Sequence, residues 1–96
     1  MIISFGDPAT EDLFHGYDTS RIRRFPQEMI PSALKKLDML NGASALIDLR
    51  SPPGNYLESL KGKLKGFYSI RINARWRLVF RWEGGDACDV SITDYH

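Results

Sequence analysis

The chain has few of the residues that build crosslinked, metal-bound or membrane-spanning proteins. Its 96 residues contain one cysteine, Cys88, so neither an internal disulfide nor a metal site made of cysteines alone is possible. The longest stretch without a charged residue, 39–47, is far shorter than the ~20 apolar residues of a membrane-spanning helix. The N-terminus has no basic, extended apolar leader. We therefore expect a cytoplasmic protein that has no membrane partner.

The length and composition are those of a small globular domain. Hydrophobic residues make up 43% of the chain and charged residues 26%, both close to globular averages. A chain of this size can bury one core but has little room for a large enclosed cavity. We expect a single domain over residues 1–96.

The net charge of +1 conceals an uneven distribution of charge along the chain. Residues 50–81 contain eight Lys and Arg residues and a single acidic one, Glu58, which gives this segment a charge of +7. Residues 82–96 contain four acidic residues and no Lys or Arg. A basic segment inside a nearly neutral chain indicates an anionic partner that binds at one place.

The first half of the sequence predicts helices. Residues 2–5 are expected to form a short strand, after which Asp7 and Pro8 are typical of a helix start and Gly16 of its end. A second helix is expected from Gln27 or Pro31 to Leu40, followed by a short helical turn in 44–49 and a loop at 51–55. The apolar residues of the second helix recur at helical spacing.

The second half predicts an antiparallel meander. Apolar and polar residues alternate from residue 67 onward, in three runs separated by short turns. Helices followed by strands predict an α+β domain in which the N-terminal helices pack on one face of a mainly antiparallel sheet.

Strand register follows from the requirement that opposed residues share a face. A loop at 73–75 places Ile70 opposite Leu78 and Arg71 opposite Arg77. A second loop at 84–86 places Leu78 opposite Ile92 and, nearer the turn, Trp82 opposite Cys88. Cys88 is then expected on the apolar face as a buried structural thiol.

This register gathers cations on the polar face of the sheet. Arg71 and Arg77 lie opposite each other, with Arg75 and Tyr95 nearby, and like charges so placed are unfavourable without an anion. A solvated strand face is the alternative, but a phosphate-binding surface is favoured because guanidinium groups match phosphate oxygens and aromatic rings stack on unpaired RNA bases. The residues predicted to bind RNA are Lys63, Lys65, Tyr68, Arg71, Asn73, Arg75 and Arg81.

The last three residues, Asp94, Tyr95 and His96, could transfer protons at the edge of this surface. RNA contains its own nucleophile, the 2′-OH, so its cleavage needs a base, an acid and positive charge but no metal or other cofactor. The alternative is a C-terminal tripeptide that frays.

These residues together resemble the HigB toxins of the RelE superfamily. The resemblance extends over nearly the whole chain and rests on LKKLDMLN (34–41), DLRSPPGN (48–55), LKG (60–62), YSIRINARWRLVF (68–80) and the terminal DYH. It implies the small α+β fold of that family and a bacterial type II toxin–antitoxin system. It further implies a toxin that cleaves mRNA in the ribosomal A site and is inhibited by a HigA-type antitoxin with a helix-turn-helix domain. Operator DNA would be contacted only through that antitoxin.

The resemblance also assigns catalytic residues. It matches Asp94, Tyr95 and His96 to the catalytic end, Arg77 to the arginine that stabilises the transition-state phosphate, and Lys61 to a basic site residue. Glu58 stands where some members have histidine. We therefore expect His96 to be the main proton-transfer residue, with Tyr95 stacking on or polarising the substrate, and cleavage that is weaker or differs in codon preference.

Two other functions remain open on the sequence. One is a basic module that binds RNA or the ribosome with little or no cleavage and is inhibited by an acidic or helix-turn-helix partner. The other is an RNase that acts on naked RNA without the ribosome.

Overall fold

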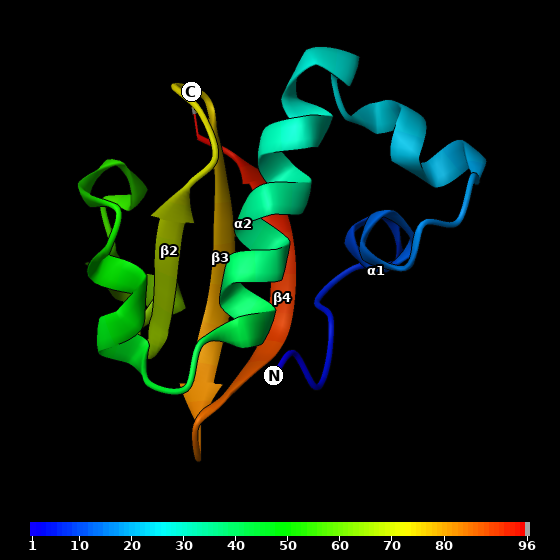
Figure 1. The fold of residues 1–96 in the computed structure, drawn as a ribbon. Helices are drawn as coiled ribbons and strands as arrows, with labels where there is room; N and C mark the ends of the chain where they lie inside the picture. The colour runs from blue at the N-terminus through cyan, green and yellow to red at the C-terminus, as the bar shows by residue number, and fades with distance from the viewer. Residues whose placement is uncertain (96) are drawn as a thin grey trace.

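In the computed structural model, residues 1–95 are described, and they form two α-helices and a four-stranded antiparallel sheet of order β1-β2-β3-β4 (Figure 1). The helices are α1 (Pro8–His15) and α2 (Ile30–Gly42). The strands are β1 (Glu58–Ser59), β2 (Phe67–Arg71), β3 (Trp76–Glu83) and β4 (Asp86–Asp94). Short 3-10 turns make up much of the connecting chain. The predicted α+β fold is confirmed.

The signals read from the sequence at the start and end of α1 are present in the structure. The Asp7 carboxylate accepts a hydrogen bond from the Thr10 backbone N–H at 2.8 Å, and Pro8 occupies the first turn, where its missing N–H costs nothing. Gly16 ends the helix in the left-handed conformation, with φ of 77°. Local chemistry therefore determines both ends of α1.

The second helix starts between Gln27 and Pro31, the two starting residues predicted from the sequence. A 3-10 turn occupies Gln27–Met29, and α2 begins at Ile30 with Pro31 in its first turn. Ala33, Leu37 and Leu40 form its fully buried stripe. Helix α2 lies across β3 and β4 in Figure 1, and this stripe belongs to one hydrophobic cluster with buried residues of the strands.

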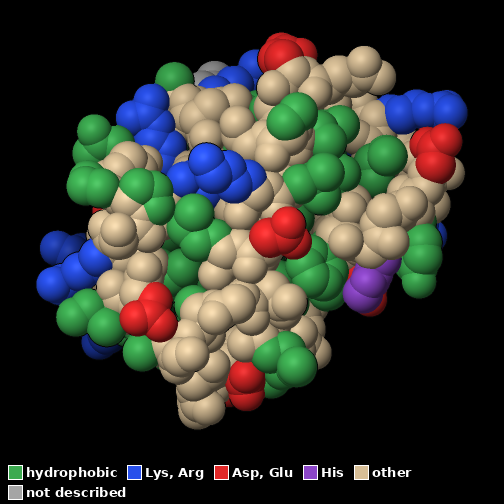
Figure 2. All heavy atoms as spheres, in the orientation of Figure 1, with side chains coloured by type: hydrophobic (Ala, Val, Ile, Leu, Met, Phe, Trp, Pro, Cys, Tyr) green, Lys and Arg blue, Asp and Glu red, His purple; other side chains and the backbone are tan. Residues whose placement is uncertain are grey.

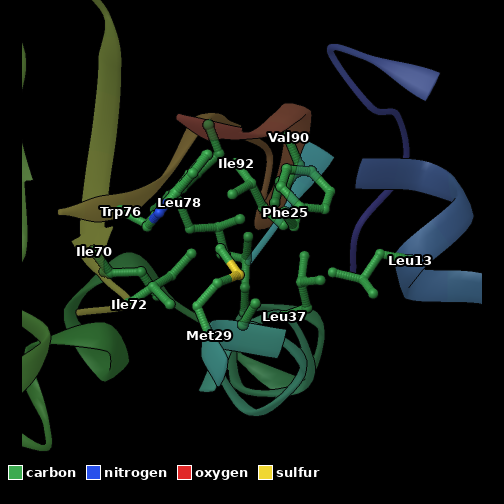
Figure 3. Close-up of a cluster of buried hydrophobic side chains, with 14 of the residues drawn as sticks. Leu13, Phe25, Met29, Leu37, Ile70, Ile72, Trp76, Leu78, Val90 and Ile92 are labelled. Atoms are coloured by element: carbon green, nitrogen blue, oxygen red, sulfur yellow. The ribbon is translucent and has the colours of Figure 1, made fainter. Parts of the chain in front are cut away.

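The hydrophobic core fills the space between α2 and the sheet. Figure 3 shows Met29 and Leu37 pointing toward Leu78, Ile70 and Ile92 of the strands. The Phe25 ring packs edge-on against Trp76, with ring centroids 5.8 Å apart. Because side chains alternate along a strand, the strand residues next to Ile70, Leu78 and Ile92 point to the opposite face of the sheet, which is called the open face below.

The predicted register is confirmed at the end of the sheet that bears the arginines. Arg71 pairs with Arg77, Ile70 with Leu78, and Arg77 in turn with Thr93. At this end of the sheet, core side chains of adjacent strands lie opposite one another, and this requirement sets the pairing of the strands.

Near the β3–β4 turn the predicted register is wrong by one residue. The turn contains Gly84 and Gly85 alone, both with positive φ, and Arg81 pairs with Cys88 instead of with Asp89. A β-bulge at Asp89, whose φ is 51°, restores the predicted register beyond it. Cys88 is buried as expected, but the shift places it on the open face and not on the core face beside Trp82.

The N-terminal residues cover the outer edge of β4. The predicted strand at 2–5 consists of isolated parallel bridges, Ile2 to Ala87 and Phe5 to Val90. Gly6 follows at close range, since a Cβ at that position would lie 3.0 Å from the carbonyl oxygen of Asp89. Hydrogen bonds to this segment satisfy backbone groups that an edge strand would otherwise expose.

The helix-covered side of the molecule has no single basic field. Figure 2 shows this side, where Lys and Arg side chains lie in several separate places. Among residues 1–95, no helix combines the length and apolar character needed to span a membrane.

Candidate nucleic-acid interface

Arg77, the second residue of β3, is the best-anchored cation on the open face. Its side chain is only 12% exposed. Its Nε donates to Ser69 Oγ at 2.8 Å, and its Nη2 donates to the Tyr56 carbonyl oxygen at 2.6 Å. The Glu58 carboxylate lies 3.6 Å from the same Nη2. These contacts hold the guanidinium plane in one orientation before any ligand arrives.

One edge of this guanidinium remains available. Within residues 1–95, Nη1 of Arg77 has no hydrogen-bond partner. The Tyr95 ring, 40% exposed, has its centroid 6.0 Å from Arg77 Cζ. The N–H groups of Nη1 are therefore free to bind an anion next to an aromatic ring.

A small pocket adjoins Arg77 at this end of the sheet. It has a volume of about 230 Å³ and is lined by Arg71, Asn73, Ala74, Arg77 and Tyr95. Four of these residues, all except Ala74, were predicted from the sequence to bind RNA or to take part in catalysis. Asn73 also shapes the pocket wall, because its side-chain oxygen accepts from the Arg75 and Trp76 N–H groups and so holds the β2–β3 turn.

Tyr56 is a site residue that the sequence reading did not find. It follows a 3-10 turn at Pro53–Asn55, and its φ of 45° is uncommon for an aromatic residue. The residue is 57% exposed, and Arg71 Cζ lies 5.5 Å from its ring centroid. The sequence gives only the Pro-Pro-Gly-Asn turn before it, which predicts a loop but not the face on which that loop lies.

Two of the predicted RNA-binding arginines are already paired with carboxylates. Arg75 holds Asp94 through Nε and Nη2, at 2.9 and 2.7 Å, and this hydrogen bonding raises the pKa of Arg75. Arg81 contacts Asp89 at 2.7 Å and Glu83 at 2.5 Å, and the hydrogen bond that Arg81 donates to Asp89 is the main cause of its raised pKa. Local carboxylates therefore balance their charge, whereas Arg71 stands against a tyrosine ring.

The predicted lysines lie at the other end of β2. Lys61 and Lys65 line a second pocket of about 320 Å³ that also includes Tyr68, and Lys63 is exposed in the adjoining 3-10 turn. The Tyr68 ring is on the helix-covered face, where it stacks on Phe80 with centroids 6.2 Å apart. The structure thus separates the lysines from the pocket at Arg71 and Arg77.

The predicted C-terminal residues are described in part. The Tyr95 backbone N–H donates to the Arg75 carbonyl oxygen at 2.6 Å, so the chain is tied to the sheet as far as Tyr95. His96 lies outside the described residues. Together with the Arg75–Asp94 pair, this bond fixes Asp94 and Tyr95 beside the pocket.

Metal and thiol chemistry find little support in the part of the chain that the structure describes. Residues 1–95 contain no group of three or more His, Cys, Asp or Glu side chains that could hold a metal ion. Burial raises the pKa of the Cys88 thiol, which disfavours the reactive thiolate.

Comparison with known proteins identifies the family. Residues 4–96 match the family of RelE-like toxins of the type II toxin–antitoxin system HigB. The chain is 41% identical over 87 residues to Toxin HigB-1 of Vibrio cholerae, covering 91% of this chain and 90% of the relative. The chain belongs to the HigB-like toxin family. A second HigB relative, Endoribonuclease HigB of Proteus vulgaris, is 30% identical over the full length of both chains.

Solved structures place this HigB-like chain in the wider RelE fold. The toxin–antitoxin complex of YoeB and YefM from Staphylococcus aureus contains a chain that matches with a TM-score of 0.60 and 23% identity, covering 100% of this chain and 98% of that one. A YoeB/ParE toxin from Agrobacterium tumefaciens matches with a TM-score of 0.57 and 17% identity over the full length of both chains. The resemblance read from the sequence, and the fold it implied, are confirmed.

Proposed function

We propose that this HigB-like toxin is an endoribonuclease that cleaves mRNA in the ribosomal A site without a metal ion and so inhibits translation. The main support is the geometry of Arg77, which is nearly buried, is held by Ser69 and Tyr56, and has an Nη1 without a hydrogen-bond partner among the described residues, beside a second arginine. Such a preorganised cation stabilises a phosphate whose charge rises in the transition state. The name of the Proteus vulgaris relative, an endoribonuclease, supports the same reaction.

In the proposed reaction the 2′-oxygen of the RNA attacks the neighbouring phosphorus and the 5′-oxygen leaves. One group accepts the proton of the 2′-OH and another protonates the leaving oxygen. We assign proton transfer chiefly to His96, with Tyr95 stacking on or polarising the nucleotide and Asp94 completing the catalytic end. Arg77 and Arg71 bind the phosphate oxygens. Lys61 is assigned as a further basic residue of the site and contributes its positive charge from the second pocket.

The size of the pocket supports dependence on the ribosome. A volume of about 230 Å³ holds roughly one phosphate and part of a nucleotide, which is below the usual range for small-molecule sites. The segment 61–65, which contains Lys61, Lys63 and Lys65, would extend the contact along the RNA. A site this open does not by itself hold a flexible strand in line for attack, and a ribosome that presents the codon would do so.

We further propose the partners and compartment that go with this activity. The toxin acts in the cytoplasm as one domain over residues 1–96 and is held inactive by a HigA-type antitoxin with a helix-turn-helix domain. An antitoxin partner is supported by the similar fold of a chain in the complex of YoeB with YefM. Operator DNA is contacted only through that antitoxin.

The test is to express the chain alone and map mRNA ends in arrested cells. The wild-type protein is expected to give cuts at codon positions, and Arg77→Ala and His96→Ala to abolish them. The matched control is Arg23→Ala, which removes an exposed arginine from the turn at Ser20–Arg24. Arrest without cuts would refute cleavage and favour the binding module.

The same protein incubated with RNA tests ribosome dependence. Cleavage is expected only when ribosomes are present. Treating the toxin with EDTA beforehand should not reduce this cleavage, measured on the same ribosomes with untreated toxin as the reference. Equal cleavage of naked RNA would instead identify a free-standing RNase.

A further inference from the structure

We propose that Tyr56 is a base-stacking residue that, with Tyr95, holds two nucleotides of single-stranded RNA on either side of the phosphate bound by the arginines. This inference rests on the proposed function and adds a binding residue to it. Tyr56 is not among the residues predicted above for catalysis or RNA binding.

The ring of Tyr56 is exposed and lies against a cation. Tyr56 is 57% exposed and its ring lies against the Arg71 guanidinium, 5.5 Å from Cζ. Packing on a cation fixes the orientation of the ring while leaving it surface for a second planar group. A large aromatic side chain held in this way is suited to stacking on an unpaired base.

The backbone that carries the Tyr56 ring is held rigidly. Asn55 is fully buried, and its side-chain amide donates to the carbonyl oxygens of Leu49 and Ser51 while accepting from Lys36. The carbonyl of Tyr56 itself accepts from Arg77. The residue therefore holds the phosphate-binding arginine through its backbone and presents its ring through a left-handed conformation that bulky residues seldom adopt.

The same arrangement of arginine and tyrosine occurs twice on neighbouring strands. Arg71 and Arg77 are directly paired across β2 and β3, and each guanidinium lies against a tyrosine: Tyr56 for Arg71 and Tyr95 for Arg77. Both arginines line the same pocket. Two paired cations, each with a tyrosine ring against it, suit the order base, phosphate, base of an unstacked dinucleotide, whereas the bases of a duplex are hidden in its own stack.

The test measures binding to a short single-stranded RNA whose 2′-hydroxyls are methylated, so that it cannot be cleaved. Fluorescence anisotropy gives the affinity for the wild type, Tyr56→Asn and Tyr56→Phe. Asparagine tolerates the left-handed backbone and removes the ring, while phenylalanine keeps the ring. Tyr17→Asn is the matched control, because Tyr17 is also 57% exposed but lies against His15, with ring centroids 5.5 Å apart.

Tyr56→Asn is expected to weaken binding about tenfold, the effect of losing one base stack, whereas Tyr56→Phe and Tyr17→Asn bind as the wild type does. Replacing the bases of the RNA one at a time by abasic sites should reveal one position at which the Tyr56→Asn penalty disappears. Circular dichroism confirms that each variant is folded. The inference is wrong if the wild type does not bind, if Tyr56→Asn binds normally, or if its penalty persists at every abasic position.

These outcomes are separable from those for cleavage. Normal binding by Tyr56→Asn together with normal cleavage on ribosomes would refute the stacking role and leave the proposed endoribonuclease intact. A binding defect with no cleavage by the wild-type protein would refute the nuclease and leave the stacking role. A variant that loses affinity for the antitoxin but not for RNA would show that the ring serves a protein partner, and would also overturn the inference.

Discussion

Replacing Asn55 by alanine should destabilise the protein strongly, although the residue lies in a connecting segment. Its side chain is 0% exposed and its amide donates to Leu49 O at 3.0 Å and, more weakly, to Ser51 O at 3.4 Å. Its oxygen accepts from the Lys36 ammonium, and partial burial lowers the pKa of that lysine. One side chain thus joins α2 to the loop that precedes Tyr56.

The magnitude follows from the groups left without partners. Alanine leaves the buried Leu49 carbonyl unsatisfied, which costs about 1–3 kcal/mol, and removes a charge-assisted bond from Lys36 worth about 1.5–3 kcal/mol. Lys36 can turn partly toward water, so we expect a total loss near 3 kcal/mol in the free energy of unfolding. For a domain of this size that corresponds to a fall in Tm of roughly 12–24 °C.

Urea denaturation followed by tryptophan fluorescence measures this loss. The control is a double-mutant cycle with Lys36→Met, which keeps the aliphatic stem of the lysine and removes its charge. Because Asn55 and Lys36 contact each other directly, the effects of the two substitutions should not add. A loss below about 0.5 kcal/mol for Asn55→Ala, or strict additivity with Lys36→Met, would refute the reasoning.

Three further predictions concern the stability of other parts of the fold. Hydrogen bonds from Thr19 and from Arg21 lower the pKa of Asp12, so the ionised carboxylate should stabilise the fold fully above its unfolded pKa of about 4 and lose this effect as pH falls through the folded value. Asp12→Asn should therefore make the free energy of unfolding depend less on pH in acid, and an unchanged pH profile would contradict this. Cys88 should react with a thiol reagent at pH 8 only after unfolding, and labelling of the native protein at the rate of a free thiol would show that it is accessible. Gly6→Ala should destabilise the protein by about 1–3 kcal/mol, because the added Cβ meets backbone at 3.0 Å, and faster amide exchange confined to residues 1–6 would locate the effect.

The predictable parts of the fold are those determined by short-range chemistry or by a single periodicity. Asp7, Pro8 and Gly16 define α1 through local hydrogen bonding and backbone preference, so neighbouring residues suffice to predict its ends. The alternation in β2 and β3 allows one register that keeps apolar residues together. That register brought Arg71 and Arg77 together correctly from the sequence alone.

The features that could not be predicted depend on contacts between distant segments. The position of Tyr56 over Arg71 requires the buried Asn55, whose partners come from α2 and from the loop at 49–51. The pairing of Arg75 with Asp94 depends on side-chain rotamers that a strand register does not specify. The bulge at Asp89 has no strong sequence signal, since a three-residue turn without a bulge satisfies the same apolar pattern.

The bulge and the glycine turn of the β3–β4 hairpin compensate for each other in residue count. A two-residue turn with a one-residue bulge spans the same length of chain as a three-residue turn with no bulge, so Arg77 faces Thr93 in both arrangements. An insertion in the turn can thus be offset by loss of the bulge, and a deletion by its gain, without moving the cationic end of the hairpin.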